Sequence, residues 1–177
     1  SAYYANLSIL KSDQIEFIGT KKEENSTLDK DIIRSYKVSE AFSSDLLRGV
    51  TDLENINVAT NETMDAESSG ILNLSRVSEV SPNTNTILVK ASIITDRPNL
   101  MKRIDFGYSD QVKVFVNNQL VYSGNNSFRS RDYRYLGSIG IFDSIYFELQ
   151  EGENEIAFAI TERMGGWGII SKFVDED

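Results

Sequence analysis

Apolar side chains alternate with polar or small ones through the second half of the chain. In residues 111–116 three valines occupy every second position, with Lys113 and Phe115 between them. The same period of two recurs in residues 86–94, 144–149 and 155–160. A β-strand turns successive side chains to opposite faces, so this period predicts strands that each have one buried face.

The segments between these predicted strands carry turn residues. Asn117 and Asn118 stand between two alternating runs, and Asn tolerates a positive φ better than most residues. Residues 150–155 form a second, glycine-containing turn, and both prolines, Pro82 and Pro98, lie in polar connectors. Short strands separated by turns predict an all-β fold, an antiparallel sandwich of about eight to nine strands in two sheets.

The first half of the chain is less regular. Its patterns predict strands in residues 3–10, 14–19 and 32–42. A charged linker is expected over residues 21–31, one short helix within residues 43–50, and a polar loop over residues 60–70.

Composition excludes several kinds of chemistry. The 177 residues include no cysteine and no histidine, which removes disulfides, thiolate zinc sites and the ordinary serine or cysteine triad. A net charge of −9 argues against general binding to nucleic acid, and no run of about 18 apolar residues is present to span a membrane. The 27 acidic residues single out no catalytic pair, so no enzyme activity is expected.

Two blocks of the sequence resemble a known kind of module. FGYSDQVKVFVNNQLVYSG and LQEGENEIAFAITERMGGWG resemble the strands and turns of galactose-binding-like jelly rolls, the carbohydrate-binding-module type found in glycoside hydrolases. The resemblance covers residues 31–177 and implies a jelly-roll sandwich. It also implies an accessory role, because this scaffold hosts sugar binders, protein binders and structural modules alike.

The first residues have two interpretations. AYYANLSIL resembles the final strand of a laminin-G-like sandwich, which would make residues 1–30 a remnant of a preceding domain. Alternatively, residues 3–10 add a strand to the jelly roll itself, since strand addition requires only an exposed sheet edge.

A basic and aromatic loop is the main candidate site. Arginine presents forked donors to hydroxyls or carboxylates, and tyrosine offers a ring that stacks on sugars. The predicted ligand-binding residues of this loop are Arg129, Arg131, Asp132, Tyr133 and Tyr135. In the alternative interpretation the loop is structural, and its arginines, Arg134 included, pair with Asp110, Asp143 or Glu162.

Trp167 and a set of oxygen-bearing residues are two further candidate sites. Trp167 lies between glycines and is either a sugar-stacking platform or a core residue beside a bend. An oxygen-rich set could hold one structural calcium ion, although its spacing matches no defined loop motif: Asp52, Glu54, Asn55, Asp65 and Glu67. No other cofactor or metal site is predicted.

These observations lead to one functional hypothesis and one alternative. The hypothesis is a noncatalytic carbohydrate-binding or accessory module of a larger bacterial carbohydrate-active or surface protein, secreted to an extracellular or periplasmic location. Its expected partners are a glycan or a neighbouring domain. The alternative is a structural or protein-interaction sandwich with no small ligand.

Overall fold

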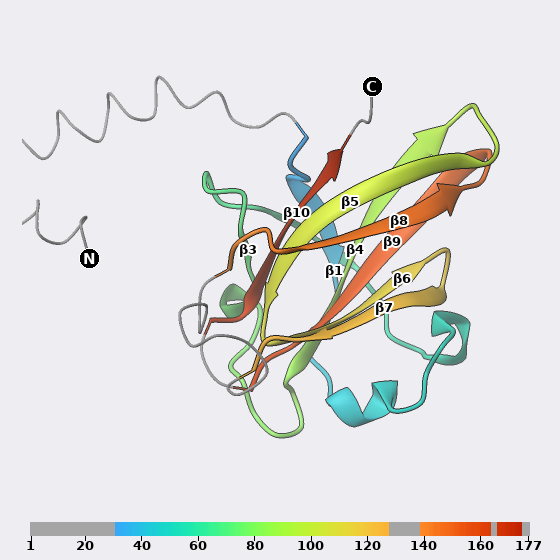
Figure 1. Cartoon of the computed structure of the whole chain (residues 1–177). Helices are drawn as coiled ribbons and strands as arrows, with labels where there is room; N and C mark the ends of the chain where they lie inside the picture. Colours follow the sequence, from blue (N-terminus) through green and yellow to red (C-terminus); the bar gives the residue numbers. More distant parts are fainter. Residues whose placement is uncertain (1–30, 128–138, 164–165, 175–177) are drawn as a thin grey trace, which may run out of the picture. The chain divides into compact units, whose positions relative to one another are not determined.

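The computed structural model describes residues 31–127, 139–163 and 166–174, and these residues form two antiparallel sheets packed face to face (Figure 1). The larger sheet has the order β2-β1-β4-β9-β6-β7. Its strands are β1 (Ser35–Val38), β2 (Glu62–Asp65), β4 (Thr86–Thr95), β6 (Gln111–Val116), β7 (Gln119–Asn125) and β9 (Gly152–Thr161). The smaller sheet has the order β3-β10-β5-β8, with β3 (Leu72–Asn73), β5 (Leu100–Ser109), β8 (Asp143–Leu149) and β10 (Gly168–Val174). The predicted all-β sandwich is confirmed.

The remaining regular elements are three short 3-10 helices: η1 (Ser44–Leu47), η2 (Leu53–Asn55) and η3 (Leu74–Arg76). The helix expected within residues 43–50 is therefore confirmed as η1. No helix in the described part of the chain has the length and apolar character needed to cross a bilayer. The strands and linker expected within residues 1–30, and hence the two interpretations of that region, lie outside the described residues.

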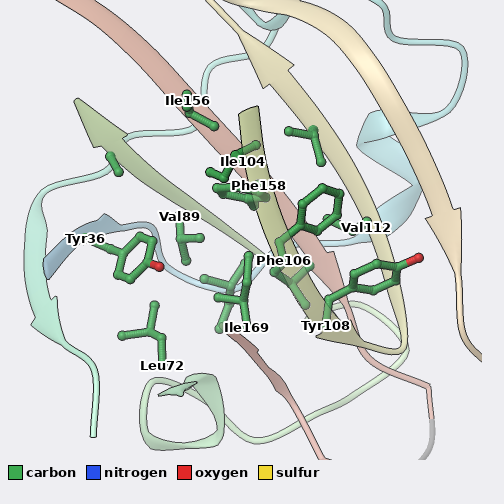
Figure 2. Packing of buried hydrophobic residues seen from close by; sticks show 14 of the residues in the cluster. Tyr36, Leu72, Val89, Ile104, Phe106, Tyr108, Val112, Ile156, Phe158 and Ile169 are labelled. Atoms are coloured by element: carbon green, nitrogen blue, oxygen red, sulfur yellow. The ribbon is translucent and has the colours of Figure 1, made fainter. Parts of the chain in front are cut away.

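The alternation in the later strands builds the main core. Val114 of β6 and Phe158 of β9 are fully buried between the sheets, where they meet Ile104 and Phe106 of β5. Figure 2 shows Ile104, Phe106 and Phe158 converging from both sheets, with Ile169 of β10 among them. The predicted inward faces of β6 and β9 are confirmed.

Both predicted turns occur, although the second spans only residues 150–151 rather than 150–155. Asn117 and Asn118, which connect β6 to β7, have φ of 48° and 70°. Gly152, the first residue of β9, directly follows the turn from β8 and has φ of 96°. The left-handed region is open to Gly and tolerated by Asn, which explains why the chain reverses at these positions.

Three strands differ from the sequence expectation. β2 lies inside the predicted loop 60–70, because an edge strand needs only backbone pairing to β1 and buries little of its own surface. β3 is too short to show a period. The alternation pattern named no strand over β5, which begins at Leu100, because Lys102 and Arg103 interrupt the alternation near its start. The described residues therefore form ten strands rather than eight or nine.

A second apolar layer covers part of the outer face of the larger sheet. Leu47 and Leu53 pack there on Leu88, Phe115 and the small residues of β9. Residues 42–58, which we call the outer layer, carry both leucines and contain η1 and η2. The outer layer appears in cyan in Figure 1, below the larger sheet.

Backbone hydrogen bonds fasten the outer layer to the β6–β7 hairpin. The amide of Leu53 donates to the carbonyl of Asn118 at 2.9 Å, and the amide of Leu120 donates to the carbonyl of Thr51 at 2.8 Å. The outer layer is therefore held at a defined place on the sheet, and its edge forms one wall of the site described next.

Candidate functional site

A cleft of about 440 Å³ opens on the outer face of the larger sheet, where the outer layer ends. We call it the outer cleft. It is lined by side chains and backbone from η1 and its flanks and from β6, β7 and the end of β9: Ser44, Asp45, Leu47, Arg48, Gly49, Gln111, Val112, Lys113, Ser123, Gly124, Asn125, Thr161 and Arg163.

Strand register explains why polar side chains collect there. Gln111 of β6 lies between Asn125 of β7 and Thr161 of β9, which makes one polar row across three strands. One step along the strands, Lys113 lies opposite Ser123. Because Val112 and Val114 point into the core, the intervening residues of β6 must face outward.

The wall of the outer cleft is built by η1. Ser43 caps this helix, its hydroxyl accepting a hydrogen bond from the amide of Asp45 at 3.3 Å. Leu47 is buried, so the helix lies against the sheet with its carbonyl end over β6. There the ammonium of Lys113 donates to the carbonyl of Leu47 at 2.7 Å, which joins the floor to the wall.

The charge of the outer cleft is opposite to that of the whole chain. Its lining includes three cations, Arg48, Lys113 and Arg163, whereas the chain carries a net charge of −9. Among the described lining residues the single carboxylate is Asp45, and it forms an exposed ion pair with Arg48 at 2.6 Å. The described lining therefore offers donors to a ligand and includes no pair of carboxylates.

One buried acid on the opposite sheet also lacks the properties of a catalytic group. Burial by itself raises the pKa of Asp105, but hydrogen bonds from Ser144 and Arg103 outweigh it and hold that pKa below its ordinary value. Arg103 contacts both carboxylate oxygens, at 2.7 and 3.1 Å. Such a lowered pKa suits a structural ion pair rather than a general acid, which needs a raised one.

The predicted binding loop lies mostly outside the described residues. Arg129, Arg131, Asp132, Tyr133 and Tyr135 all fall within residues 128–138. The residue just before this segment is described: the hydroxyl of Ser127 accepts a hydrogen bond from the side-chain amide of Gln111 at 3.5 Å. Since Gln111 lines the outer cleft, the loop starts beside it.

The carboxylates named for the structural alternative are described. Asp110 and Glu162 are buried at 4% and 3% exposure, while Asp143 is half-buried at the start of β8. Asp110 accepts hydrogen bonds from the hydroxyl of Ser109 and from the backbone amide of Arg163. Their pairing with the loop arginines stays a prediction.

Trp167 belongs to the core. Its side chain is 2% exposed, and its indole nitrogen donates to the carbonyl of Ile160 at 3.0 Å. Gly168 follows because an added Cβ there would lie 2.8 Å from the carbonyl oxygen of Leu72. The ring therefore offers no face to a ligand, and its placement corresponds to the alternative interpretation as a core residue.

The oxygen-rich set does not gather around one point. Asp52 caps η2, and its other oxygen accepts from the side-chain amide of Gln119 at 2.7 Å. Glu67 instead accepts from Asn73, at 3.2 Å. Within residues 31–127, 139–163 and 166–174, no three acidic side chains lie close enough together to hold a metal ion.

The floor of the outer cleft was missed by the sequence expectation. Gln111, Lys113 and Ser123 stand at the polar positions of two predicted strands, where a polar residue usually faces only water. The alternation could have placed them on one face. It could not have shown that the outer layer would form a wall beside them.

Comparisons with known proteins find solved structures similar to this chain but no matching sequence family. No family model matches it, and no curated protein matches it. A β-glucosidase from Kluyveromyces marxianus, solved with glucose, has a TM-score of 0.47 and 9% identity over 81% of this chain and 16% of the enzyme.

Two smaller modules are also similar. A family 35 carbohydrate-binding module from an environmental isolate has a TM-score of 0.38 and 12% identity, over 52% of this chain and 68% of that module. A PA14 sugar-binding domain from an RTX adhesin has a TM-score of 0.34 and 12% identity, over 86% and 75%. The similar solved structures include a carbohydrate-binding module, the type that the sequence resembles.

Proposed function

We propose that residues 31–177 form a noncatalytic carbohydrate-binding module that serves a larger extracellular or periplasmic bacterial protein. The observation that carries this proposal is the outer cleft, where amide, hydroxyl and ammonium groups of neighbouring strands face one open hollow. A saccharide presents closely spaced hydroxyls, each of them a donor and an acceptor. A rigid sheet with such groups in rows suits it well.

The single carboxylate in the described lining of the outer cleft supports saccharide binding rather than hydrolysis. Glycoside hydrolysis uses two carboxyl groups on either side of the scissile bond. Among the described lining residues the one carboxylate is Asp45, which is held by Arg48. The cleft can therefore hold a saccharide but lacks, in these residues, the groups that would cleave it.

The charge of the outer cleft favours acidic saccharides over basic ones. Three cations against one carboxylate leave an excess of positive charge beside the ligand. Partly exposed charges attract a ligand carboxylate modestly, and salt screens that attraction. Uronic-acid-containing oligosaccharides should therefore bind more tightly than neutral ones at low salt.

The adjoining loop supplies the aromatic surface in this proposal. Arg129, Arg131, Asp132, Tyr133 and Tyr135 follow Ser127, whose hydroxyl is bonded to Gln111 of the cleft floor. Tyrosine rings stack on the apolar face of a pyranose. We infer that the loop completes the site along the side where β7 ends.

A steric variant tests the outer cleft. Ser123→Tyr places a large side chain at an exposed strand position that lines the cleft, while Val121→Tyr places the same side chain two residues away on β7, at a position outside the lining. On a glycan array and by calorimetry, Ser123→Tyr should lose at least about tenfold in affinity, about 1.4 kcal/mol, and Val121→Tyr should bind like the wild type. Equal binding by all three proteins would show that the cleft is not the site.

A second variant separates the two interpretations of the loop. Tyr133→Ala should abolish saccharide retention and leave the melting temperature nearly unchanged, because a stacking ring contributes to the complex rather than to the fold. Thermal unfolding and affinity electrophoresis measure the two effects. A large fall in melting temperature would assign Tyr133 to the structural alternative.

The competing function is a protein-interaction module, and one surface favours it. Met101 and Tyr146 are 58% and 53% exposed on the outer face of the smaller sheet, away from the outer cleft. Exposed apolar side chains of this kind are typical of surfaces that meet another protein. A wild-type protein that retains no saccharide would favour this function.

A further inference from the structure

A second, separate depression lies on the outer face of the larger sheet, where β1, β2, β4 and β9 run side by side. It has a volume of about 210 Å³. We call it the lysine groove and define it by its polar side chains: Ser35, Lys37, Thr63, Lys90, Ser92 and Glu155. The outer layer packs on the sheet between this groove and the outer cleft. Beneath it lies Leu88, which is two residues before Lys90 on β4 and faces the same side of the sheet.

Strand register places two like charges side by side in the lysine groove. Lys37 of β1 is the direct partner of Lys90 on β4, and Thr63 of β2 is the partner of Lys37 on the other side. Directly opposed lysines repel each other and weaken the pairing of two strands. A local arrangement that acts against the stability of the fold is a reason to look for a function.

Only one of the two ammonium groups is neutralised within the described residues. Lys90 forms an ion pair with Glu155 at 2.7 Å, and the two side chains are 19% and 35% exposed. Lys37 is exposed and makes no ion pair in the described part of the chain. Asp65 stands on the same face of β2, opposite Ser35, and is not paired with Lys37 there.

The donors of the lysine groove suit a small oxyanion. Two ammonium groups provide charge, and the hydroxyls of Ser35, Thr63 and Ser92 can each donate a hydrogen bond. Bonds from charged donors to anionic oxygens are the stronger class of hydrogen bond. With Glu155 counted, the lining of the groove has an excess of one positive charge, which equals the charge of one carboxylate or sulfate-ester group; Asp65 lies outside this lining.

We propose that the lysine groove binds a sulfate or carboxylate group, and that Lys37 is the residue that provides the unneutralised charge. The free anion and the same group carried on an acidic polysaccharide are the two possible sources of this chemistry. The groove is too far along the sheet to share residues with the outer cleft, so the proposal does not depend on saccharide binding there.

The test is a titration followed by amide NMR shifts on the full chain. Inorganic sulfate, a sulfated oligosaccharide and its unsulfated counterpart are added in turn, against sodium chloride at equal ionic strength. In the wild type, sulfate should produce saturable shifts at the amides of Lys37, Thr63 and Lys90. Lys37→Gln should weaken this binding about fivefold or more.

Two matched variants make the result specific. Arg76→Gln removes a positive charge from η3, outside the lysine groove, and should bind sulfate like the wild type. Ser123→Tyr alters the outer cleft alone and should also leave the sulfate titration unchanged. Lys37→Gln removes a charge that faces another lysine and has no ion-pair partner among the described residues, so the melting temperature of this variant without ligand should equal or exceed that of the wild type.

The outcomes are distinct. Groove shifts with inorganic sulfate alone assign the site to a free anion, and shifts with the sulfated but not the unsulfated oligosaccharide assign it to an acidic polysaccharide. Both results support the lysine groove. Unchanged affinity in Lys37→Gln, or no saturable shift with any anion, overturns the proposal.

Discussion

Single residues join the two sheets, and Tyr36 is the clearest example. Its hydroxyl lies 2.7 Å from the hydroxyl of Ser171, which links β1 of one sheet to β10 of the other inside the core. Burial raises the pKa of Tyr36 to about 12, although the bond to Ser171 and the charge of Arg34 act in the opposite direction. The neutral phenol is therefore the form that the fold stabilises.

Because the pKa of Tyr36 is raised, the free energy of unfolding should depend on pH in the alkaline range. The folded pKa exceeds the ordinary value of 10.0, so the stabilisation is complete below pH 10 and is lost as the pH rises toward about 12. The shift corresponds to about 2 to 3 kcal/mol of unfolding free energy. Stability should therefore fall with rising alkalinity partly through this one residue.

Tyr36→Phe tests the effect. It should cost about 1 kcal/mol at pH 7, because Ser171 loses its buried partner, and this deficit should disappear near pH 11, where the wild type has lost part of its advantage. Denaturant unfolding of both proteins at several pH values measures the difference, and the other tyrosines are common to both. A deficit that stays constant with pH would contradict the prediction.

The outer layer is the element that forms a cleft on an otherwise plain sheet face. Ala157 and Ala159 of β9 are small, which leaves space for Leu47 and Leu53 to reach the sheet. The result is an apolar contact on a face that would otherwise be solvated. The outer cleft borders this contact, since Leu47 belongs to both.

Adjacent leucines in η1 provide a matched test. Leu47 is buried, whereas Leu46 is 54% exposed. Leu47→Ala should lower the free energy of unfolding by about 2 to 4 kcal/mol and weaken saccharide binding, because the wall of the outer cleft loses its anchor. Leu46→Ala should change stability by less than about 0.5 kcal/mol. Denaturant melts and calorimetry measure both, and equal effects of the two variants would show that the outer layer is not anchored as described.

Net charge affects both the stability of the whole molecule and its affinity for charged ligands. The net charge of −9 means that the folded chain repels itself at neutral pH, while the outer cleft and the lysine groove are locally positive. Salt screens both the repulsion within the chain and the attraction of acidic ligands to the two depressions. Screening the repulsion stabilises the fold, whereas screening the attraction weakens binding.

Raising sodium chloride from about 20 to about 200 mM should therefore raise the melting temperature and lower the affinity for acidic ligands. A neutral oligosaccharide serves as the control, since its affinity should change little. Scanning calorimetry and titration calorimetry in the same buffers measure the two responses. Affinity for acidic and neutral ligands falling in parallel would contradict the charge assignment.

Local pattern was enough to predict several elements. The valines of β6 and the apolar positions of β9 alternate strictly, and two asparagines stand where a tight reversal needs positive φ. β2 escaped prediction, because an edge strand is defined by its partner's backbone rather than by its own side chains. The loop residues 128–138 stay a prediction, while the floor of the outer cleft went unnoticed among ordinary polar positions.

The sequence by itself determined which side chain of each late strand turns inward, since alternation is a property of one strand and needs no partner. Tertiary structure alone decided which outward residues meet. Gln111 lies beside Thr161, and Lys37 beside Lys90, only through the register of strands far apart in the chain. Binding surfaces on a sheet are built across strands, and register between distant strands depends on packing that no local pattern records.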